Sequence, residues 1–555
     1  MEVGSEGVFR VGWGFPRHQH PTKDPLVASA YPKTKSQSKP ISSAACANAL
    51  HANLVRLIEK AKQEHALAAM VLHVLAGLRC LGRQLVAMIL EERSQALHQG
   101  RSGPPRCPHC GRPMRKPQKK ETERLTLLGR LRYRRHRWLC PHCRRTHSPL
   151  DATLGLHPLH DGHSREFVTE LALMCTLHAF EHGCNLFERC FGFPVSTHLT
   201  YRVVMGIGKT LVNREMVRAE QCWKARSERP EDFEPTPAEL RKRTRAKRIY
   251  VMMDNSKARI QEGKRGRGAK KRTKQKGVQE KFNIAVKGPS LVKEVEDDKA
   301  SRGESDWRDV RALLIYQEKD VAQCSKDRRQ ILKRRVLAHV GTQEQWLKLL
   351  HLAFHEEGVY VAEEVVVVAD GGAGIWQAVS ELLPSTSQRR VVQILDWCHA
   401  VSHLWAVAKK WKKGTKKAAV KERAKWIDGL VKYLAEGQVS NVLQRLQKLR
   451  KGRTGELAEE LDRCIKYLTE HRGRMHYRQY RNAGMTIGSG AIESIHKWVA
   501  KARCHLAGMA WSEVGLNAML RLRCLWASGR WDDEFQRPAA AAADFPHHSA
   551  GGPLA

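Results

Sequence analysis

Two cysteine pairs carry the spacing of a metal site. Cys107 and Cys110 enclose a Pro-His dipeptide, and Cys140 and Cys143 repeat this pattern further along the chain. One Cys-x-x-Cys pair can ligate a cation from a tight turn, and two pairs complete a closed tetrahedral sulfur site of the structural zinc type. The sequence therefore predicts a zinc ribbon, with residues 125–133 and Trp138 as its β-hairpin.

The four cysteines also admit roles besides zinc binding. His109 and His142 are alternative ligands with poorer geometry inside the turn, and four unrelated buried cysteines would give the same pattern. A redox pair is disfavoured because no thioredoxin-like βαβ pattern surrounds either motif. The odd total of 15 cysteines fits a reducing compartment with a metal site, and not a disulfide framework.

Three acidic residues follow or begin elements that could bring them together. Asp254 follows the β-rich run 249–253, Asp370 follows the run 365–369, and Glu493 stands at the start of an expected helix. Chemistry in open α/β sheets gathers at the carboxyl ends of strands. Each aspartate alone could be a turn former. Together the three carboxylates predict a site for two Mg²⁺ or Mn²⁺ ions about 4 Å apart, which would activate a water or a 3′-hydroxyl for in-line displacement at phosphorus.

The charge of the chain points to a polyanionic partner. Among 555 residues, 97 Lys and Arg stand against 57 Asp and Glu, a formal net charge of +40. Such an excess favours nucleic acid, because neutralised phosphates release their counterions. A ribosome-associated or merely basic soluble protein is the blander alternative.

Neither a membrane span nor a secretion signal is expected. The most apolar stretch, residues 66–90, is interrupted by His73, Arg79 and Arg83, and the N-terminus lacks the pattern of a signal peptide.

Basic and aromatic residues cluster in two places where they could contact DNA. Residues 409–425 are dense in lysine around Trp411, which could stack on an unpaired base; a solvated helix with a packed tryptophan is the alternative. A second group precedes or follows Glu493. The predicted contacts are Lys409, Lys410, Trp411, Lys412, Lys413, Arg474, Arg478, Lys497, Lys501 and Arg503. Basic residues beside the cysteine pairs, among them Arg130, Arg132 and Arg135, favour a phosphate-contacting face there too.

Composition and periodicity divide the chain into a series of segments. Residues 1–47 and 536–555 read as disordered, and residues 48–100 as a long helix or helix pair. Within residues 158–240, a Gly/Pro turn near 192–194 followed by Ser196-Thr197 suggests two short helices of helix-turn-helix type, or an ordinary helical hairpin. The remaining segments are a cysteine module at 101–150, an α/β region at 246–400 and 485–535, and a basic all-α insertion at 401–484.

Four longer blocks, in their order along the chain, carry a family resemblance. They are VVVVADGGAGIW at 365–376, ILDWCHAVSHLW at 394–405, YLTEHRGRMHYRQYRNAGMTIGSGAIESIHKWVAKARCHLAGMAW at 467–511 and LRLRCLWASGRW at 520–531. With residues 307–316, these blocks resemble the DDE transposases of bacterial insertion sequences, of the ISKra type, over residues 165–535. The resemblance implies a split RNase H-like core with an all-α insertion. It also implies Asp254, Asp370 and Glu493 as the first, second and third acids.

One motif resembles a related family of transposases, and one residue departs from the family pattern. Asp396 and His399 resemble an Asp/Cys-x-x-His motif of Mutator-like transposases, which favours a supporting role in the site over a core histidine. Asn255 stands where the family has glycine after the first acid, which leaves two alternatives: it crowds the site, or it is harmless. The basic stretch 264–276 reads as an expanded loop.

The resemblance and the charge together predict a function. We expect a DNA transposase that cuts the ends of its element and joins the 3′ ends to target DNA. The expected partners are double-stranded terminal repeats, double-stranded target DNA and further copies of the chain, in the bacterial cytoplasm at the nucleoid. A structure-selective nuclease using the same two metals is one alternative, and a catalytically decayed DNA-binding protein is the other.

Overall fold

A computed structural model describes residues 43–115, 117–156, 162–228, 246–261, 305–325, 328–385, 389–411, 417–505, 509 and 511–536. The segments predicted to be disordered, residues 1–47 and 536–555, lie almost entirely outside the described residues, as does the predicted loop at 264–276. The chain divides into two compact units, Met1–Leu85 and Val86–Ala555. Each unit is described by itself.

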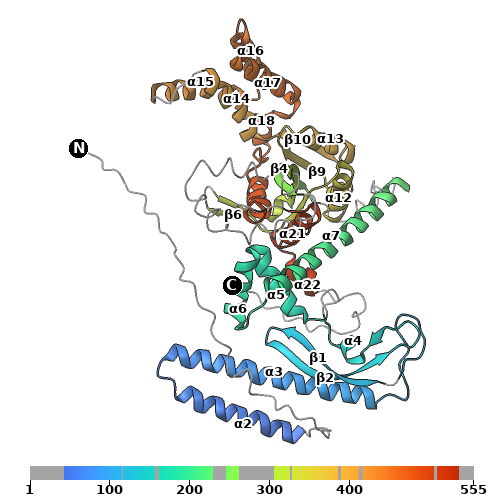
Figure 1. The fold of residues 1–555 in the computed structure, drawn as a ribbon. Coiled ribbons are helices and arrows are strands. Elements are labelled where there is room, and N and C mark those ends of the chain that lie inside the picture. Colours follow the sequence, from blue (N-terminus) through green and yellow to red (C-terminus); the bar gives the residue numbers. More distant parts are fainter. Residues whose placement is uncertain are drawn as a thin grey trace, which may run out of the picture. The chain divides into compact units, whose positions relative to one another are not determined.

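The first unit is a helical hairpin (Figure 1). Helix α2 covers Ser43–Lys62, and helix α3 begins at Leu67 and runs on to Gln99. Leu57 and Ala61 of α2 are buried, and a side chain at Gly77 of α3 would overlap Leu57. The amide of Asn53 donates to Gln84 Oε1 at 2.9 Å. The two helices therefore pack closely along one side.

Helix α3 corrects the expectation that no segment is apolar enough to span a membrane. Among the described residues it alone has the length and the composition for a span, in spite of His73, Arg79 and Arg83. The side chains of its most apolar window are not buried. One such helix is weak evidence for a span, because exposed apolar helices of other origin satisfy the same criterion.

The cysteine module is built on the predicted hairpin. Strands β1 (Gln118–Thr126) and β2 (Gly129–Leu139) pair in antiparallel register, from Gln118 with Arg137 to Thr126 with Gly129. Strand β3 (Thr146–His147) pairs with the end of β2, and helix α4 covers Pro149–Thr153. Side chains alternate along β2, so Leu131 and Tyr133 face inward and pack with Leu90 and Leu150.

Three helices follow the cysteine module: α5 (Arg165–Leu177), α6 (Phe180–Phe191) and α7 (Thr197–Glu228). The Ser164 hydroxyl accepts from the Phe167 N–H and caps α5, while Gly192, at φ 72°, ends α6. The turn therefore lies where the sequence predicts it. The prediction of two short helices is wrong, because α7 is 32 residues long and packs against α12 and α21 of the next region.

A five-stranded sheet forms the centre of the second unit, in the order β10-β9-β4-β5-β8. Its strands are β4 (Arg248–Gln261), β5 (Ser305–Gln317), β8 (Arg335–His339), β9 (Glu364–Ala369) and β10 (Arg390–Leu395). The β4/β5 and β5/β8 pairs are antiparallel, and the β4/β9 and β9/β10 pairs are parallel. The chain is therefore a mixed α/β protein.

Strand β4 is much longer than the predicted run 249–253. It continues to Gln261 because Ala258 and Ile260 are buried and pair with Arg308 and Asp306 of β5. Asp254 therefore lies inside the strand and not at its end, which corrects the sequence prediction. The parallel pairing with β9, however, stops at Met253 opposite Ala369.

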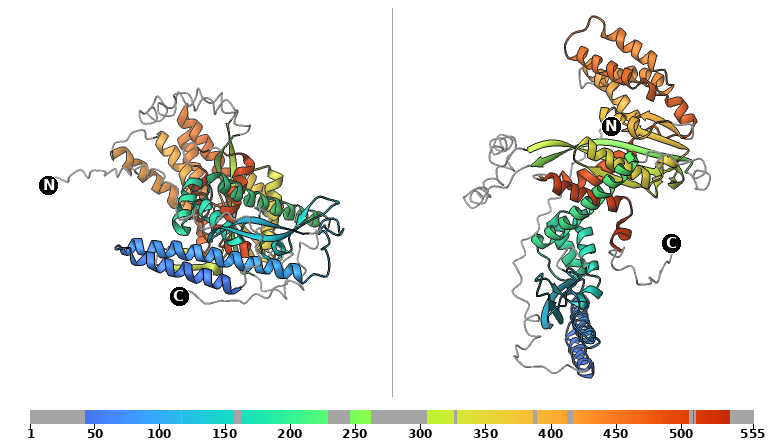
Figure 2. Two further views of the ribbon diagram at one scale, coloured as in Figure 1. Left: turned by 60° about the horizontal axis from the view of Figure 1, so that its bottom comes forward. Right: turned by 90° about the vertical axis from the view of Figure 1, so that its right-hand side faces the viewer.

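Helices pack against the sheet, and a further helical region follows β10 (Figure 2). Helix α19 (Gly490–Ile495) packs against β4 and β5, and α21 (Glu513–Ala527) packs against β8. The described residues of the region 401–484 are mostly helical, as expected, and α14 packs against α15 and α17. Its helices are α14 (Trp397–Trp411), α15 (Lys417–Ala435), α16 (Val439–Arg450), α17 (Glu456–Glu470) and α18 (Tyr477–Asn482).

The remaining elements complete the second unit. A π-helical turn, His496–Lys501, continues directly from α19 and leads to α20 (Ala502–Cys504). The others are β6 (Val321–Ser325), β7 (Arg328–Ile331), α12 (Gln343–Glu356), α13 (Ala373–Leu382), α22 (Trp531–Gln536) and the 3₁₀ turns Glu318–Asp320, Val359–Val361 and Arg472–Arg474.

Candidate acidic site at the edge of the central sheet

Asp254 and Asp370 lie side by side on neighbouring strands. Each comes one residue after the last parallel pair, Met253 with Ala369. Adjacent strands are about 4.8 Å apart, so the two backbones are in close proximity at this edge. Burial raises the pKa of Asp254, and the charge of Asp370 raises it further, while His496 and the N–H of Asn255 act in the opposite direction.

The residue after Asp254 does not crowd the site. Side chains alternate along a strand, and β4 keeps its register with β5 through Asp254 and Asn255. The Asn255 side chain therefore points to the face opposite Asp254, where it is exposed. Its backbone N–H donates to Asp254 Oδ1 at 2.8 Å. Of the two alternatives for Asn255, this geometry favours the harmless one.

Asp370 is fixed by the turn that follows β9. Its Oδ1 accepts from the Gly372 N–H at 3.0 Å, and its carbonyl accepts from Trp376 Nε1 at 2.9 Å. Gly371 lies between them against helix α17, where a side chain would overlap Tyr467 and approach His471. A glycine is therefore required here for close packing of the helical region beside Asp370.

Asp396 and His399 form a pair at the end of β10. Asp396 Oδ2 accepts from His399 twice, from the ring Nδ1 at 2.7 Å and from the backbone N–H at 2.8 Å. Burial opposes ionisation of Asp396, but these bonds and the N–H of Ser489 outweigh it and hold its pKa below the usual range. The hydrogen bond to Asp396 raises the pKa of His399 to about 9 against the effect of burial, and the charges of Asp370 and Asp254 contribute.

Glu493 reaches this pair from helix α19. The Ser489 N–H donates to Asp396 Oδ1 at 2.6 Å, and the Ser489 hydroxyl donates to Glu493 Oε1 at 3.3 Å. Ligand atoms of Asp396, His399 and Glu493 all lie within 4.8 Å of one another. In the part of the chain that the structure describes, the predicted trio Asp254, Asp370 and Glu493 does not form so close a group by itself. Asp396 and His399 are therefore more central than the sequence suggested.

Two residues of the site were not singled out from the sequence. His496 is buried, with Nε2 3.6 Å from Asp254 Oδ2. Ser489 is also buried and links Asp396 to Glu493. The Glu493-x-x-His496 spacing places both side chains on neighbouring positions of one helix, and this signal could have revealed His496.

The four predicted zinc ligands converge in the cysteine module. Cys107 Sγ lies 3.6 Å from Cys143 Sγ, and Cys110 Sγ lies 3.5 Å from Cys140 Sγ. The four sulfurs lie within 4.8 Å of one another, so they could hold one metal ion. Backbone N–H groups, first that of Cys143, lower the pKa of Cys140 to about 6, whereas, against the effect of the Arg145 N–H, burial and the neighbouring sulfurs raise the pKa of Cys143 to about 11. A lowered thiol pKa favours the thiolate that a metal requires.

Several arginines that were predicted to contact DNA instead contact other residues of the chain. Arg503 is 1% exposed, and its guanidinium donates to the Cys175 carbonyl and stacks over Phe180, so its prediction as a DNA contact is corrected. Arg135 of β2 is likewise buried, and it pairs with Asp151. A half-buried Arg474 donates to Gln393 at 2.7 Å and stacks on Trp376.

Other predicted contacts lie at the surface. Lys409, Lys497 and Lys501 are exposed. Lys410 pairs with Glu456, and Arg478 pairs with Glu436, each at 2.9 Å. The Trp411 ring packs edge-on against Trp426 at 5.0 Å. The predicted contacts Lys412 and Lys413 lie outside the described residues.

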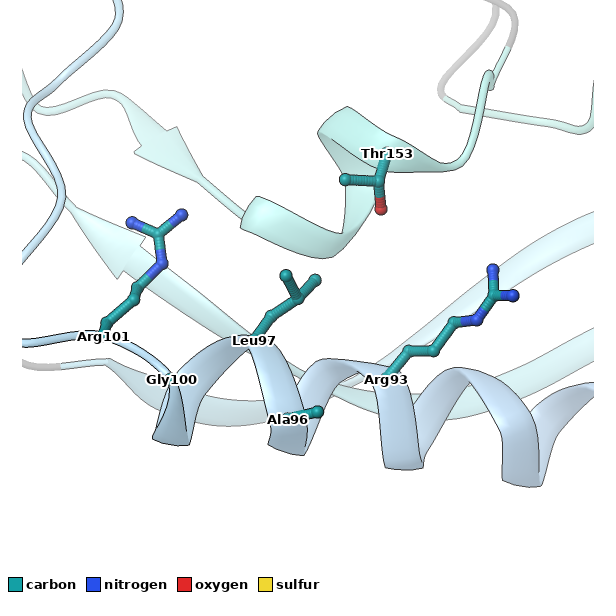
Figure 3. A pocket seen from close by; sticks show the side chains of 6 residues that line it. All are labelled: Arg93, Ala96, Leu97, Gly100, Arg101 and Thr153. Carbon is teal, nitrogen blue, oxygen red and sulfur yellow. The ribbon is translucent and has the colours of Figure 1, made fainter. Parts of the chain in front are cut away.

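A separate hollow of about 470 Å³ lies between α3 and α4. Figure 3 shows Arg93 and Arg101 on either side of Leu97, with Thr153 facing them across the hollow. None of the predicted catalytic residues lines this hollow, and its lining is mostly apolar, so the acidic edge of the sheet is the better candidate for chemistry. Comparison of the sequence with models of known protein families and with curated proteins gives no match.

Proposed function

We propose that this chain is a DNA transposase of the DDE type, with an RNase H-like catalytic core interrupted by an all-α insertion. The strand order supports this proposal. In the order β10-β9-β4-β5-β8, the central strand β4 comes first of the five along the chain. It has an antiparallel neighbour, β5, on one side and a parallel neighbour, β9, on the other, which is the order of RNase H-like sheets. The insertion between β10 and α19 fits the same scheme.

One observation carries the proposal. Asp254 and Asp370 leave the parallel ladder at the same level, and Glu493 reaches the same edge through Ser489 and Asp396. Burial is the main cause that raises the pKa of Asp254, and the negative charge of Asp370 adds to it, so a bound cation would favour the ionised form of this carboxyl. Carboxylate oxygen donors fit a divalent cation such as Mg²⁺ or Mn²⁺.

Asp254, Asp370 and Glu493 would hold the metal ions, and ligand atoms of Asp396 and His399 lie within 4.8 Å of Glu493. When bound, such ions would supply Lewis acidity to the attacking and leaving oxygens of a phosphodiester. Asp396 is a positioning residue: it fixes the His399 ring and, through Ser489, the carboxylate of Glu493. The His399 side chain, 37% exposed, can place a positive charge near a bound phosphate.

Surface charge supports DNA as the substrate. Lys497 and Lys501 project from the π-helical turn that follows Glu493, and Lys409 projects from α14. Exposed lysines next to a catalytic edge can hold the backbone of the strand being cut. The cysteine module and helices α5–α7 would then recognise the element ends, with zinc fixing the hairpin that presents Arg130 and Arg132.

Cleavage of the element's own ends tests this proposal. Purified full-length protein, a labelled duplex carrying the sequences that flank its gene, an intact plasmid and Mg²⁺ would be mixed. We expect nicking at the element boundary and labelled strands joined to the plasmid. Cleavage of branched DNA regardless of end sequence would instead support the structure-selective nuclease. Binding with no cleavage would support the decayed DNA-binding protein.

A further inference from the structure

The helical hairpin of the first unit exposes an unusual amount of apolar surface. Nine large side chains on α2 and α3 are between 39% and 75% exposed. We call them the apolar surface of the hairpin; they are Leu54, Val55, Ile58, Leu67, Val71, Leu72, Leu75, Leu78 and Leu85. Isolated exposed leucines are ordinary, but nine exposed apolar side chains on two packed helices indicate an interaction surface.

The spacing along α3 identifies what fits this surface. Ala68, Val71, Leu75, Leu78 and Leu85 follow a three–four repeat, in which Gly82 occupies the one remaining position. All five are exposed on the helix, while the neighbouring stripe that includes Gly77 packs against α2. Apolar residues at this heptad spacing form the seam of helices that wind around each other. Helix α3 therefore has two apolar stripes: one packs against α2, and the other is exposed and could pack against a further helix.

We infer that the apolar surface of the hairpin binds the same surface of a second copy of this chain, giving a four-helix bundle. At roughly 90 Å² each, the nine side chains expose on the order of 800 Å², which is about what each partner contributes to a stable interface. A self-complementary surface of this kind is the usual basis of a twofold dimer. Further copies of the chain are already expected as partners of a transposase; the inference adds which surface pairs, and its test does not depend on catalysis.

The charges of the hairpin argue against a lipid environment. Arg56, Glu59, Lys60 and Lys62 of α2 are all exposed, and α2 stays packed on α3 through Leu57 and Gly77. Inserting α3 into a bilayer would either carry these charges into lipid or separate the two helices. A bundle of two hairpins buries the apolar seam and leaves the charges in water.

Sedimentation velocity of the full-length, zinc-loaded chain, treated with nuclease and held in high salt, tests the inference. The native protein is expected at twice the 63.0 kDa chain mass. A Leu75→Lys/Leu78→Lys variant should raise the dimer dissociation constant at least about 100-fold, the range expected when charges replace central interface leucines. Ala76→Lys, at an exposed position off the seam, should leave the dimer intact.

A second variant guards against misfolding. Leu75→Ala/Leu78→Ala keeps helix propensity and removes only side-chain area, so it should weaken the dimer with an unchanged helical circular dichroism spectrum. Three results would overturn the inference: a native protein that sediments at the mass of one chain at tens of micromolar, a dimer unaffected by both double variants, or native protein recovered only with detergent-solubilised membranes.

Discussion

The Asp396 carboxylate and the His399 ring are joined by a 2.7 Å hydrogen bond at the end of β10. The Asp396 carboxylate also accepts a hydrogen bond from the Ser489 N–H, and the Ser489 hydroxyl donates to Glu493. The buried Asp396 carboxylate therefore connects the end of β10 to the helix that carries Glu493. The pair therefore holds the His399 ring within 4.8 Å of the carboxylates of Asp396 and Glu493.

The protonation of His399 can be measured directly. With its pKa raised to about 9 by Asp396, His399 should be only about 1% neutral at pH 7, and it should resist diethyl pyrocarbonate, which modifies neutral imidazole. Asp396→Asn removes the main cause, so modification of His399 by mass spectrometry should rise more than about tenfold. The exposed His142 is the internal control and should react equally in both proteins. Equal reactivity of His399 in both would refute the pairing.

The cysteine site predicts one zinc ion per chain. Cys140→Ser should lower the bound zinc, measured by elemental mass spectrometry of the dialysed protein. It should also destabilise the β1–β2 hairpin, because a bound metal would link the cysteine turn before β1 to the cysteine turn after β2. Cys324→Ser, an exposed cysteine on β6, should keep native zinc content. Native zinc in Cys140→Ser, or its loss in Cys324→Ser, would contradict this assignment.

Much of the architecture follows from local pattern. The apolar runs at 249–253 and 365–369 mark β4 and β9, because strands buried on both faces are unbroken apolar segments in the sequence. The polar half of β4 was missed. Asp254, Ser256 and Lys257 resemble a loop, and only pairing with the distant β5 makes this segment a strand. The length of α7 was missed for a similar reason, since its core face is recognised only when α12 and α21 pack on it.

Gly371 and Gly374 offer a matched pair of substitutions. Gly371→Ala should lower the free energy of unfolding by about 1–3 kcal/mol through overpacking against Tyr467, and it should slow DNA cleavage by displacing the turn that holds Asp370. Gly374 lies in helix α13, where a side chain would meet only Gln343 at ordinary contact distance, so Gly374→Ala should be neutral or stabilising by up to about 1 kcal/mol. Thermal unfolding and a cleavage assay would measure both effects. Identical behaviour of the two variants would contradict the packing described here.

Only part of the candidate site could be predicted from the sequence. Asp370 and Glu493 stand in distinctive segments, so they could be predicted. The tight grouping of Asp396, His399 and Glu493 depends on Ser489, which is far from Asp396 in sequence. Arg503 was misassigned because an arginine between other basic residues looks like a surface residue. Its burial depends on Phe180 and Cys175, which are contributed by earlier helices.

Two buried histidines predict loss of stability in mild acid. Burial lowers the pKa of both His339 and His351 to about 4, against about 6.5 in the unfolded chain. The unfolded state therefore binds more protons between these values, so stability is complete above pH 6.5 and is lost as the pH falls towards 4. At pH 5.5, each of the two histidines should lower the free energy of unfolding by about 1.4 kcal/mol.

His351→Gln isolates one of these contributions. Glutamine can keep a hydrogen bond to Tyr360, which lies 2.7 Å from His351 Nδ1, but does not titrate. The variant should therefore lose less melting temperature than the native protein between pH 7.5 and 5.5, followed by tryptophan fluorescence. A pH dependence identical to that of the native protein would show that His351 is not buried in its neutral form.

The most direct test of the account is the dependence of DNA cleavage on Asp370. Cleavage of a duplex carrying the gene-flanking sequences, with Mg²⁺ and full-length protein, would be compared for the native chain, Asp370→Asn and Asp428→Asn, an exposed acid of α15 paired with Lys432. We predict that Asp370→Asn lowers the single-turnover cleavage rate by about 1,000-fold or more while DNA binding and zinc content stay native, because the carboxylate acts in the transition state. Asp428→Asn should cleave normally. Native cleavage by Asp370→Asn would contradict the central claim.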